Sequence, residues 1–212
     1  MNSGIGNQLA AQHSHSWEPF YAHVPGLKVI SAGTHEDARG MLATALESSD
    51  PVIIFEYTSL LNTQSEIPLN SGPVDIDKAK IRRAGKDLSI ITYGPGVYKA
   101  LAAAKELASS GIDVEVLDLR VLNPIDNETI MDSVAKTHRV LVVEEAWRSV
   151  SISSEIISRI MEHSFYELDM PIQRLCGIEV PIPYAKHMED ASIPQQQDIV
   201  DTILKMMQHD RV

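Results

Sequence analysis

The chain has 212 residues, of which 44% are hydrophobic and 22% are charged, and this is the composition of an ordinary globular protein rather than of a disordered chain. Its 29 acidic and 18 basic side chains give a formal net charge of −11, which disfavours a nucleic-acid partner because phosphate backbones are themselves negative. The single cysteine, Cys176, excludes an intrachain disulfide, and no apolar run reaches the roughly 18 residues of a membrane span. We therefore expect a soluble, intracellular protein of one large domain or two small ones.

The first part of the chain predicts a loop, a strand, a helix and a second strand. The glycines and histidines of residues 1–26 are typical of a loop. The apolar run at 27–31 predicts a strand. Thr34, with Asp37 three residues later, resembles the capping signal of a helix. Residues 51–55 then predict a second strand, buried on both faces as in parallel sheets.

Residues 57–86 show little periodicity, and a connection of this length is uncommon inside one domain. We interpret it as a linker or a functional loop, so that the chain divides into residues 1–56, 57–86 and 87–212. Basic side chains near the end of the connection are expected to face solvent or another subunit. They are Lys80, Arg82, Arg83 and Lys86.

Strands alternate with helices through the rest of the chain. The predicted strands cover residues 88–92, 114–117, 140–143 and 172–175. The predicted helices cover residues 97–109, 125–135, 152–161 and 199–207. This alternation implies parallel pairing with right-handed crossovers, and the fold class is therefore α/β.

A glycine turn after the strand at 88–92 imitates a dinucleotide-binding loop. Gly94-Pro95-Gly96 opens the next helix, and the following strand ends near Asp118. The dinucleotide motif requires a third small residue where Lys99 lies, and Pro95 lacks a backbone N–H. We therefore interpret the turn as a helix start and not as a nucleotide site.

Histidines gather near the N-terminus. His13 and His15 would lie on one side of an extended chain, as two metal ligands can, but Glu18 is the only acid close by and no first shell is complete. A histidine in a cleft can also serve as a general acid or hydrogen-bond donor, because its pKa is close to neutral. From the residues alone, the simplest interpretation remains a surface or packed histidine.

Two acids, Glu144 and Glu145, follow the strand at 140–143. Open α/β sheets bind ligands at the carboxyl ends of their strands, so the pair is a candidate for a site there. Alternatively, one or both acids face solvent or pair with Arg148. The sequence contains no nucleophile elbow, phosphate-binding loop or zinc-protease motif, and hydrolase and nucleotide-triphosphatase functions therefore lack support.

Several stretches, in this order and spacing, resemble the beta subunits of the thiamine-diphosphate-dependent 2-oxo-acid dehydrogenases. They are Ala10-Ala11-Gln12-His13-Ser14 and residues 23–29, 85–93, 115–124, 142–145 and 180–194. The last stretch is most similar to the pyruvate dehydrogenase members of the family. Together they cover nearly the whole chain.

The resemblance implies a transketolase-like fold. Residues 1–56 would be the later part of a pyrimidine-binding domain, and residues 87–212 a transketolase C-terminal domain with a parallel sheet. In this family two beta subunits pair with two alpha subunits, and thiamine diphosphate lies between the two kinds of subunit. The alpha subunit holds the diphosphate and magnesium, and the acyl group passes to the lipoyl arm of a dihydrolipoyl acyltransferase core. The resemblance places such a subunit in the cytoplasm, or in the mitochondrial matrix of a eukaryote.

The resemblance also implies functional residues. His13 matches the active-site histidine of the family, which assists acyl transfer. The glutamate that protonates the cofactor lies upstream of this stretch in the family, outside these 212 residues, so we expect the chain alone to bind no cofactor and to be inactive. A structural potassium ion of some members would fall on Ala45, Leu46, Ser48 and Asp50. Ser48 replaces a family carboxylate there, so we expect no tightly bound ion.

Residues 149–154 depart from the family pattern, because β-branched and hydroxyl residues replace glycines there. The sequence leaves two functions open. One is the enzyme-subunit function, oxidative decarboxylation of a 2-oxo acid within a pyruvate dehydrogenase-type complex. The other is a non-catalytic module for oligomerisation or docking, and exposed surface left by a partial first domain would favour homo-oligomers.

Overall fold

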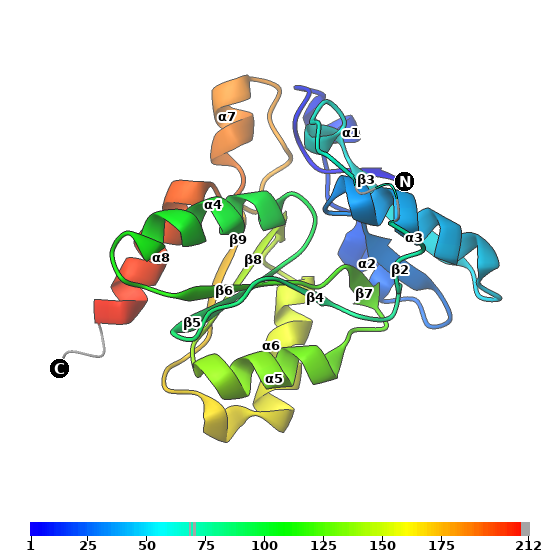
Figure 1. The fold of residues 1–212 in the computed structure, drawn as a ribbon. Coiled ribbons are helices and arrows are strands. Elements are labelled where there is room, and N and C mark those ends of the chain that lie inside the picture. The colour runs from blue at the N-terminus through cyan, green and yellow to red at the C-terminus, as the bar shows by residue number, and fades with distance from the viewer. Residues whose placement is uncertain (68, 70, 209–212) are drawn as a thin grey trace.

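Two sheets lie side by side in the computed structural model, which describes residues 1–67, 69 and 71–208 (Figure 1). The larger sheet has strand order β4-β6-β5-β8-β9 and the smaller one β1-β3-β2-β7. Each sheet has one antiparallel edge strand, β4 or β7, and its other pairs are parallel. The α/β fold class and the parallel pairing predicted from the sequence are confirmed.

The larger sheet is covered by helices on both faces. Its strands are β4 (Lys80–Arg83), β5 (Leu88–Thr92), β6 (Val114–Asp118), β8 (Val140–Trp147) and β9 (Gln173–Gly177). Helices α4 (Gly96–Ala108) and α8 (Gln196–Gln208) lie on one face, and α5 (Asn127–Thr137) and α6 (Ile152–His163) on the other (Figure 1). Side chains of β5 alternate between the two helical layers, since Ile90 packs with α4 and α8 and Ile91 with α5 and α6. Burial on both faces explains the continuous apolar runs of these strands.

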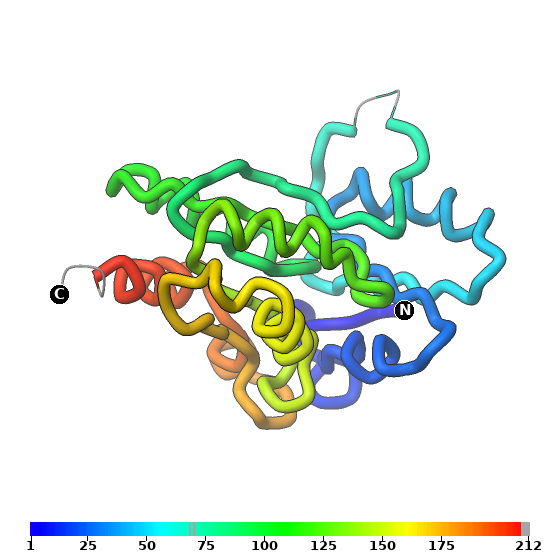
Figure 2. The backbone as a smooth tube through the Cα atoms, turned by 90° about the horizontal axis from the view of Figure 1, so that it is seen from below, coloured from blue at the N-terminus to red at the C-terminus, as the bar shows by residue number. Residues whose placement is uncertain are grey.

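The smaller sheet contains β1 (Asn2–Ser3), β2 (Lys28–Ser31), β3 (Val52–Tyr57) and β7 (Val121–Asn123). Helix α3 (His35–Glu47) follows β2, and its N-cap is the predicted one, because the Thr34 side chain accepts a hydrogen bond from the Asp37 N–H. The connection after β3 runs outward beside α3 before it returns to β4 (Figure 2). It is fastened there by the Thr44 hydroxyl, which donates to the Val74 carbonyl at 2.7 Å.

The N-terminal stretch is not the loop that we expected. It forms β1, which pairs with β3, and two short helices, α1 (Ala10–His13) and α2 (Glu18–Ala22). Helix α7 (Lys186–Ala191), strands β4 and β7, and the single 3-10 turns η1 (Thr58–Leu60) and η2 (Phe165–Glu167) are also absent from the sequence prediction. These segments have two to six residues. At this length, contacts with the rest of the molecule decide the structure rather than local periodicity.

The two sheets exchange strands. Strand β7 comes from the C-terminal part of the chain but pairs with β2, and the last residues of the connection form β4 in the larger sheet. The division at residues 1–56, 57–86 and 87–212 stays a prediction, and its residues 68, 70 and 209–212 lie outside the described ones. Within the described residues, no helix is both long and apolar enough to pass through a bilayer.

Candidate functional site

The carboxyl ends of strands from both sheets meet at one junction. In the smaller sheet β2 ends at Ser31 and β3 at Tyr57, and in the larger sheet Tyr93 follows β5. Strand β8 adds Glu144 and Glu145 at the same level, and the first residue of α2, Glu18, is buried among them. This is the position at which α/β sheets place their sites. We call Glu18, Tyr57, Tyr93, Glu144 and Glu145 the acid cluster.

Glu18 is the least compensated carboxyl of the acid cluster. Its side chain is fully buried, and its Oε1 accepts a hydrogen bond from the Ser3 hydroxyl at 2.7 Å. Its Oε2 has no hydrogen-bond partner. Burial raises the pKa of Glu18 to about 7, and the negative charge of Glu145 acts in the same direction, although the hydrogen bond from Ser3 opposes the rise. Near neutral pH this carboxyl therefore exists in both protonation states.

The two tyrosines of the acid cluster remain protonated. Burial raises the pKa of Tyr57 and of Tyr93 well above the usual value. The Tyr93 hydroxyl donates to Glu144 Oε2 at 3.0 Å, and the Tyr57 hydroxyl lies 2.6 Å from Ser31 Oγ. Each tyrosine therefore contributes a neutral hydroxyl, and not a positive charge, to the acid cluster.

Glu144 is buried and the Glu145 side chain is 9% exposed, and among the ion pairs of the described residues Glu145 meets Lys99 rather than Arg148, so neither of the alternatives considered from the sequence holds. Glu144 Oε1 accepts from the Ser153 N–H at 3.1 Å, at the positive N-terminal end of α6. Glu145 Oε1 accepts from the Lys99 ammonium at 3.0 Å, and Lys99 also donates to the Pro194 carbonyl. Among the hydrogen bonds and ion pairs of the described residues, Lys99 is the cation that meets the acid cluster.

The turn Gly94-Pro95-Gly96 is a contact between the two sheets. Gly94 has φ +55°, and a Cβ placed on it would lie 2.5 Å from Cζ of the Tyr57 ring. In a nucleotide-binding loop a phosphate would lie close to this glycine backbone, but here the Tyr57 ring occupies that position. Helix α4 begins at Gly96, in agreement with the interpretation of this turn as a helix start.

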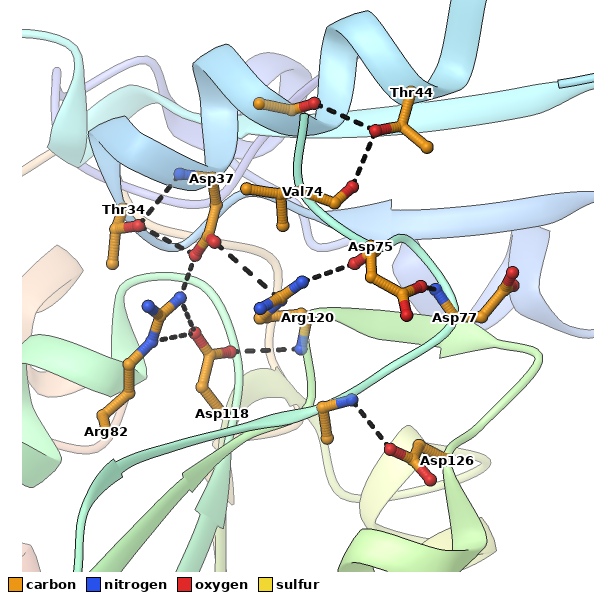
Figure 3. A network of polar contacts seen from close by, with 12 residues as sticks. Thr34, Asp37, Thr44, Val74, Asp75, Asp77, Arg82, Asp118, Arg120 and Asp126 are labelled. Atoms are coloured by element: carbon orange, nitrogen blue, oxygen red, sulfur yellow. Dashed lines mark hydrogen bonds and ion pairs between the residues drawn. The ribbon is translucent and has the colours of Figure 1, made fainter. Parts of the chain in front are cut away.

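A second buried polar network ties the same two sheets together (Figure 3). Arg82 of β4 donates to Asp37 of α3, and its Nε and terminal nitrogen both donate to Asp118 Oδ2, at 3.0 and 2.8 Å. The Arg120 N–H donates to Asp118 Oδ1 at 3.1 Å, and the Arg120 Nε lies 3.8 Å from Asp37 Oδ1. We call these four residues the ion ring. All of them are nearly inaccessible to solvent.

The ion ring corrects one sequence prediction. Arg82 was expected at a solvated or subunit-facing surface, but its side chain is 9% exposed and bridges two buried carboxylates. Burial raises the pKa of Asp118 to about 6, although the charge of Arg82 acts against the rise. Asp118 therefore remains mostly ionised at neutral pH, and the ring holds two negative and two positive charges.

The predicted catalytic residue, His13, lies outside the acid cluster. It is the last residue of α1 and is exposed. His15, two residues later, packs edge-on against Trp17 and Trp147, at 5.8 and 4.8 Å between ring centroids. Burial lowers the pKa of His15, and its Nε2 has no hydrogen-bond partner. Within the described residues, no three histidine, cysteine or acidic side chains gather as a metal site would require.

The predicted potassium positions lie together at the end of α3. The Ala45 carbonyl accepts from the Ser48 N–H at 3.2 Å, and Ser48 Oγ accepts from the Asp50 N–H at 3.2 Å. The Leu46 side chain is 80% exposed. Two oxygens that could bind an ion, the Ala45 carbonyl and Ser48 Oγ, thus accept hydrogen bonds within the turn. Potassium binding at Ala45, Leu46, Ser48 and Asp50 stays a prediction.

Sequence reasoning missed Glu18, Tyr57 and the ion ring as parts of the site. A signal for Glu18 does exist, since this acid stands among Trp17, Phe20 and Tyr21 in a stretch too apolar for a solvated loop. Arg82 has no such signal, because four basic residues in seven positions are more often a surface than a buried bridge.

The fold and the site define an α/β protein of two joined parts with polar groups between them. The family model described as "Transketolase, C-terminal domain" matches residues 77–199, and the one described as "Transketolase, pyrimidine binding domain" matches residues 1–64. The chain belongs to the transketolase family, and the predicted pairing of these two domains is confirmed.

Among proteins with these two domains, the chain is similar in sequence to several beta subunits. The mitochondrial pyruvate dehydrogenase E1 component subunit beta of Drosophila melanogaster is 42% identical over 210 residues, which are 97% of this chain and 58% of that protein. The corresponding subunit of Porphyra purpurea is 41% identical over 94% of this chain and 60% of that protein. Subunit beta of acetoin:2,6-dichlorophenolindophenol oxidoreductase of Cupriavidus necator is 38% identical over 96% of this chain and 60% of that protein. The chain thus resembles the beta subunits, as predicted, and spans about 60% of the length of these relatives.

A solved structure agrees in fold. A split-gene transketolase described as an inactive beta4 tetramer matches with a TM-score of 0.79 at 22% identity. The match covers 96% of this chain and 64% of that one.

Proposed function

We propose that these 212 residues serve as the later part of the beta subunit of a pyruvate dehydrogenase-type complex, which decarboxylates a 2-oxo acid oxidatively and transfers the acyl group to lipoamide. The observation that carries the proposal is the 42% identity over 97% of the chain to a pyruvate dehydrogenase E1 beta subunit. The partners of the proposed assembly are an alpha subunit and a dihydrolipoyl acyltransferase core. Its location would be the cytoplasm or the mitochondrial matrix.

In this function His13 is the catalytic residue of the chain. Its ring is exposed at the end of α1, so it is accessible to a cofactor held by another subunit. An imidazole can donate a proton or stabilise charge during acyl transfer. Among the described residues, no hydrogen bond or ion pair joins His13 to the acid cluster, and we therefore assign the cluster to holding the junction that carries the His13 segment.

Thiamine diphosphate and magnesium belong to the complete assembly in this proposal. When bound, the cofactor supplies a ring that accepts the electron pair released by decarboxylation. We assign the diphosphate and magnesium to the alpha subunit, as the resemblance to the family implies. The family glutamate that acts on the cofactor falls outside these residues, and we propose that the chain alone is inactive.

The proposal is tested by reduction of a dye with pyruvate as substrate. The chain is mixed with an intact alpha subunit, and the same alpha subunit is assayed alone and with a full-length beta subunit. We expect turnover with the full-length beta subunit and none above the alpha-only control with this chain. Turnover with the 212 residues would show that the inactivity part of the proposal is wrong.

An assembly role without catalysis is the second candidate. Large apolar side chains are exposed on two separate segments, with Phe20 on α2 at 65% and Tyr166 on η2 at 96%. Exposed aromatic groups of this size favour association with another surface. Light scattering at increasing concentration distinguishes the candidates, since a monomer at every concentration would remove this one.

A further inference from the structure

The loop before His13 has an unusual backbone. Four of its residues have positive φ, namely Gly4 at +78°, Gly6 at +141°, Gln8 at +52° and Ala10 at +55°. Gln8 and Ala10 carry side chains, for which this conformation is unfavourable. Such a backbone persists only where its surroundings impose it. Something outside the loop must therefore hold it.

One carboxylate from the other end of the chain meets this loop. Glu189 of α7 is fully buried, and its Oε1 accepts hydrogen bonds from the backbone N–H groups of Gly6, at 3.3 Å, and Gln8, at 3.2 Å. Its Oε2 has no hydrogen-bond partner among the described residues, and the ammonium of Lys186 lies 4.0 Å away. A buried carboxylate is costly unless it is hydrogen-bonded, so these two N–H groups and the carboxylate depend on each other.

Apolar packing brings the same two segments together. Ile5 of the loop packs with Ile182 and Ile193, which flank α7, and all three side chains are buried. A Cβ on Gly6 would lie 2.8 Å from Cα of Ser59, so the loop is also pressed against the turn after β3. Figure 1 shows α7 and α1 at the same side of the molecule.

Helix α1 cannot place His13 by itself. It has four residues, none of them buried, and its N-cap residue, Leu9, makes no side-chain cap hydrogen bond. A single uncapped turn is unstable in isolation because helix nucleation is unfavourable. The position of His13 is therefore set by the loop that leads into α1.

We propose that Glu189 is a positioning residue for His13, whose carboxylate holds the Gly6 and Gln8 backbone and so fixes the start of α1. The catalytic role of His13 rests on the proposed function, but the contact between Glu189 and the loop, and its test, do not depend on it. In this way the C-terminal part of the chain controls the placement of a residue that belongs to the N-terminal part. The sequence separation of 183 and 181 residues explains why no local pattern indicates it.

The test is amide hydrogen exchange followed by NMR, with the ring resonance of His13 assigned through the His13→Gln variant. In Glu189→Ala we expect the amides of Gly6 and Gln8 to exchange about tenfold faster or more, because their acceptor is gone. We also expect the His13 ring resonance to move. Asp190→Ala is the matched control, since Asp190 lies on the same helix and bonds Lys186 rather than the loop. It should change neither readout.

Two conservative variants separate reach from charge. Glu189→Gln keeps the acceptor at the same reach without the charge, and should keep the protection of Gly6 and Gln8. Glu189→Asp keeps the charge but is one methylene shorter, and should lose that protection. Wild-type protection in Glu189→Ala, an equal effect of Asp190→Ala, or protection that follows charge rather than reach would each overturn the proposal. Because no turnover is measured, failure of the proposed function would appear in the dye assay and not here.

Discussion

The ion ring and the acid cluster both lie between the two sheets, but they compensate their buried charges differently. In the ion ring, Asp37 and Asp118 face Arg82 and Arg120 (Figure 3). In the acid cluster, the buried Glu18 and Glu144 and the partly buried Glu145 meet one lysine, Lys99, together with neutral hydroxyls and a helix N-terminus. The charges of the ion ring are therefore paired, whereas the acid cluster holds more carboxyls than cations, and burial raises the pKa of Glu18 to about 7.

The difference indicates a division of roles. A ring of paired charges fixes the arrangement of α3, β4 and the end of β6, because Asp37 and Asp118 share Arg82, and its removal leaves both buried carboxylates without that partner. By contrast, a carboxyl with a pKa of about 7, such as Glu18, changes its protonation state with pH near neutrality. Groups with such shifted pKa values cluster at functional sites.

Arg82→Ala should break the ion ring and cause the largest loss. It leaves Asp37 and Asp118 buried next to each other without their shared guanidinium, and we expect a loss of about 3–5 kcal/mol in the free energy of unfolding. Urea-induced unfolding measures it. Arg83→Ala is the matched control, because the Arg83 pair with Asp113 is partly exposed and should contribute less than about 1 kcal/mol. Equal losses in the two variants would show that the ring has no special role.

Gly94→Ala should force the two sheets apart at the acid cluster. The added methyl would meet the Tyr57 ring, and the residue keeps its unfavourable positive φ. We expect a loss of about 2–4 kcal/mol in the same urea experiment. Gly26→Ala serves as control, since Gly26 has φ +83° but open space around its Cβ, and backbone strain alone should cost about 1–2 kcal/mol. Equal losses of unfolding free energy in the two variants would show that the contact between Gly94 and the Tyr57 ring adds nothing to the cost of backbone strain.

Glu18→Gln should remove a pH dependence. The folded-state pKa of Glu18 is raised from 4.5 to about 7, so the folded state binds more protons than the unfolded state between these values. The stabilisation is complete below about pH 4.5 and is lost as pH rises through about 7. Asp118 has the same sign, with a folded-state pKa of about 6, and the lowered pKa of His15 has the opposite sign, so the contribution of Glu18 between pH 6 and 8 is the difference between the wild type and Glu18→Gln.

Thermal unfolding across that window measures the effect. The melting temperature of the wild type should fall from pH 6 to pH 8, and that of Glu18→Gln should change much less. Glu47→Gln, an exposed glutamate at the end of α3, should keep the wild-type slope. A slope that survives in Glu18→Gln would refute the assignment of the proton.

Val150→Asn should give the smallest change and should stabilise the protein. Val150 is 90% exposed and has φ +53°, a conformation that β-branched residues disfavour and asparagine tolerates. The turn leads into α6, whose Ser153 N–H binds Glu144, so the variant also relaxes one edge of the acid cluster. We expect a gain of about 1 kcal/mol in urea unfolding. Val180→Asn, at an exposed valine without positive φ, should give no gain.

The sequence was most informative where the chain is most regular. The runs at 88–92 and 140–143 predicted strands because both of their faces are buried, and Thr34 predicted the start of α3. Strands β4 and β7 could not be predicted in the same way. They have four and three residues, and each forms at the edge of a sheet through its partner rather than through its own pattern.

The site was less predictable than the fold, for a physical reason. His13 was indicated by resemblance, and Glu144 and Glu145 by their place after a strand. The contacts that define their environment join residues far apart in sequence, such as Tyr93 to Glu144, or Glu189 to Gly6. Arg82 was expected at the surface, but in the structure it is buried and bridges Asp37 and Asp118. This pairing could not be predicted from the sequence.

We propose above that this chain forms the His13-bearing later part of a 2-oxo-acid dehydrogenase beta subunit. The most direct measurement is a three-component assay of pyruvate-dependent dye reduction with the alpha subunit, this chain and an N-terminal fragment of a full-length beta subunit. We predict turnover only when all three components are present, and its loss when His13→Gln replaces the wild-type chain. Turnover without the fragment, or undiminished turnover with His13→Gln, would contradict the claim.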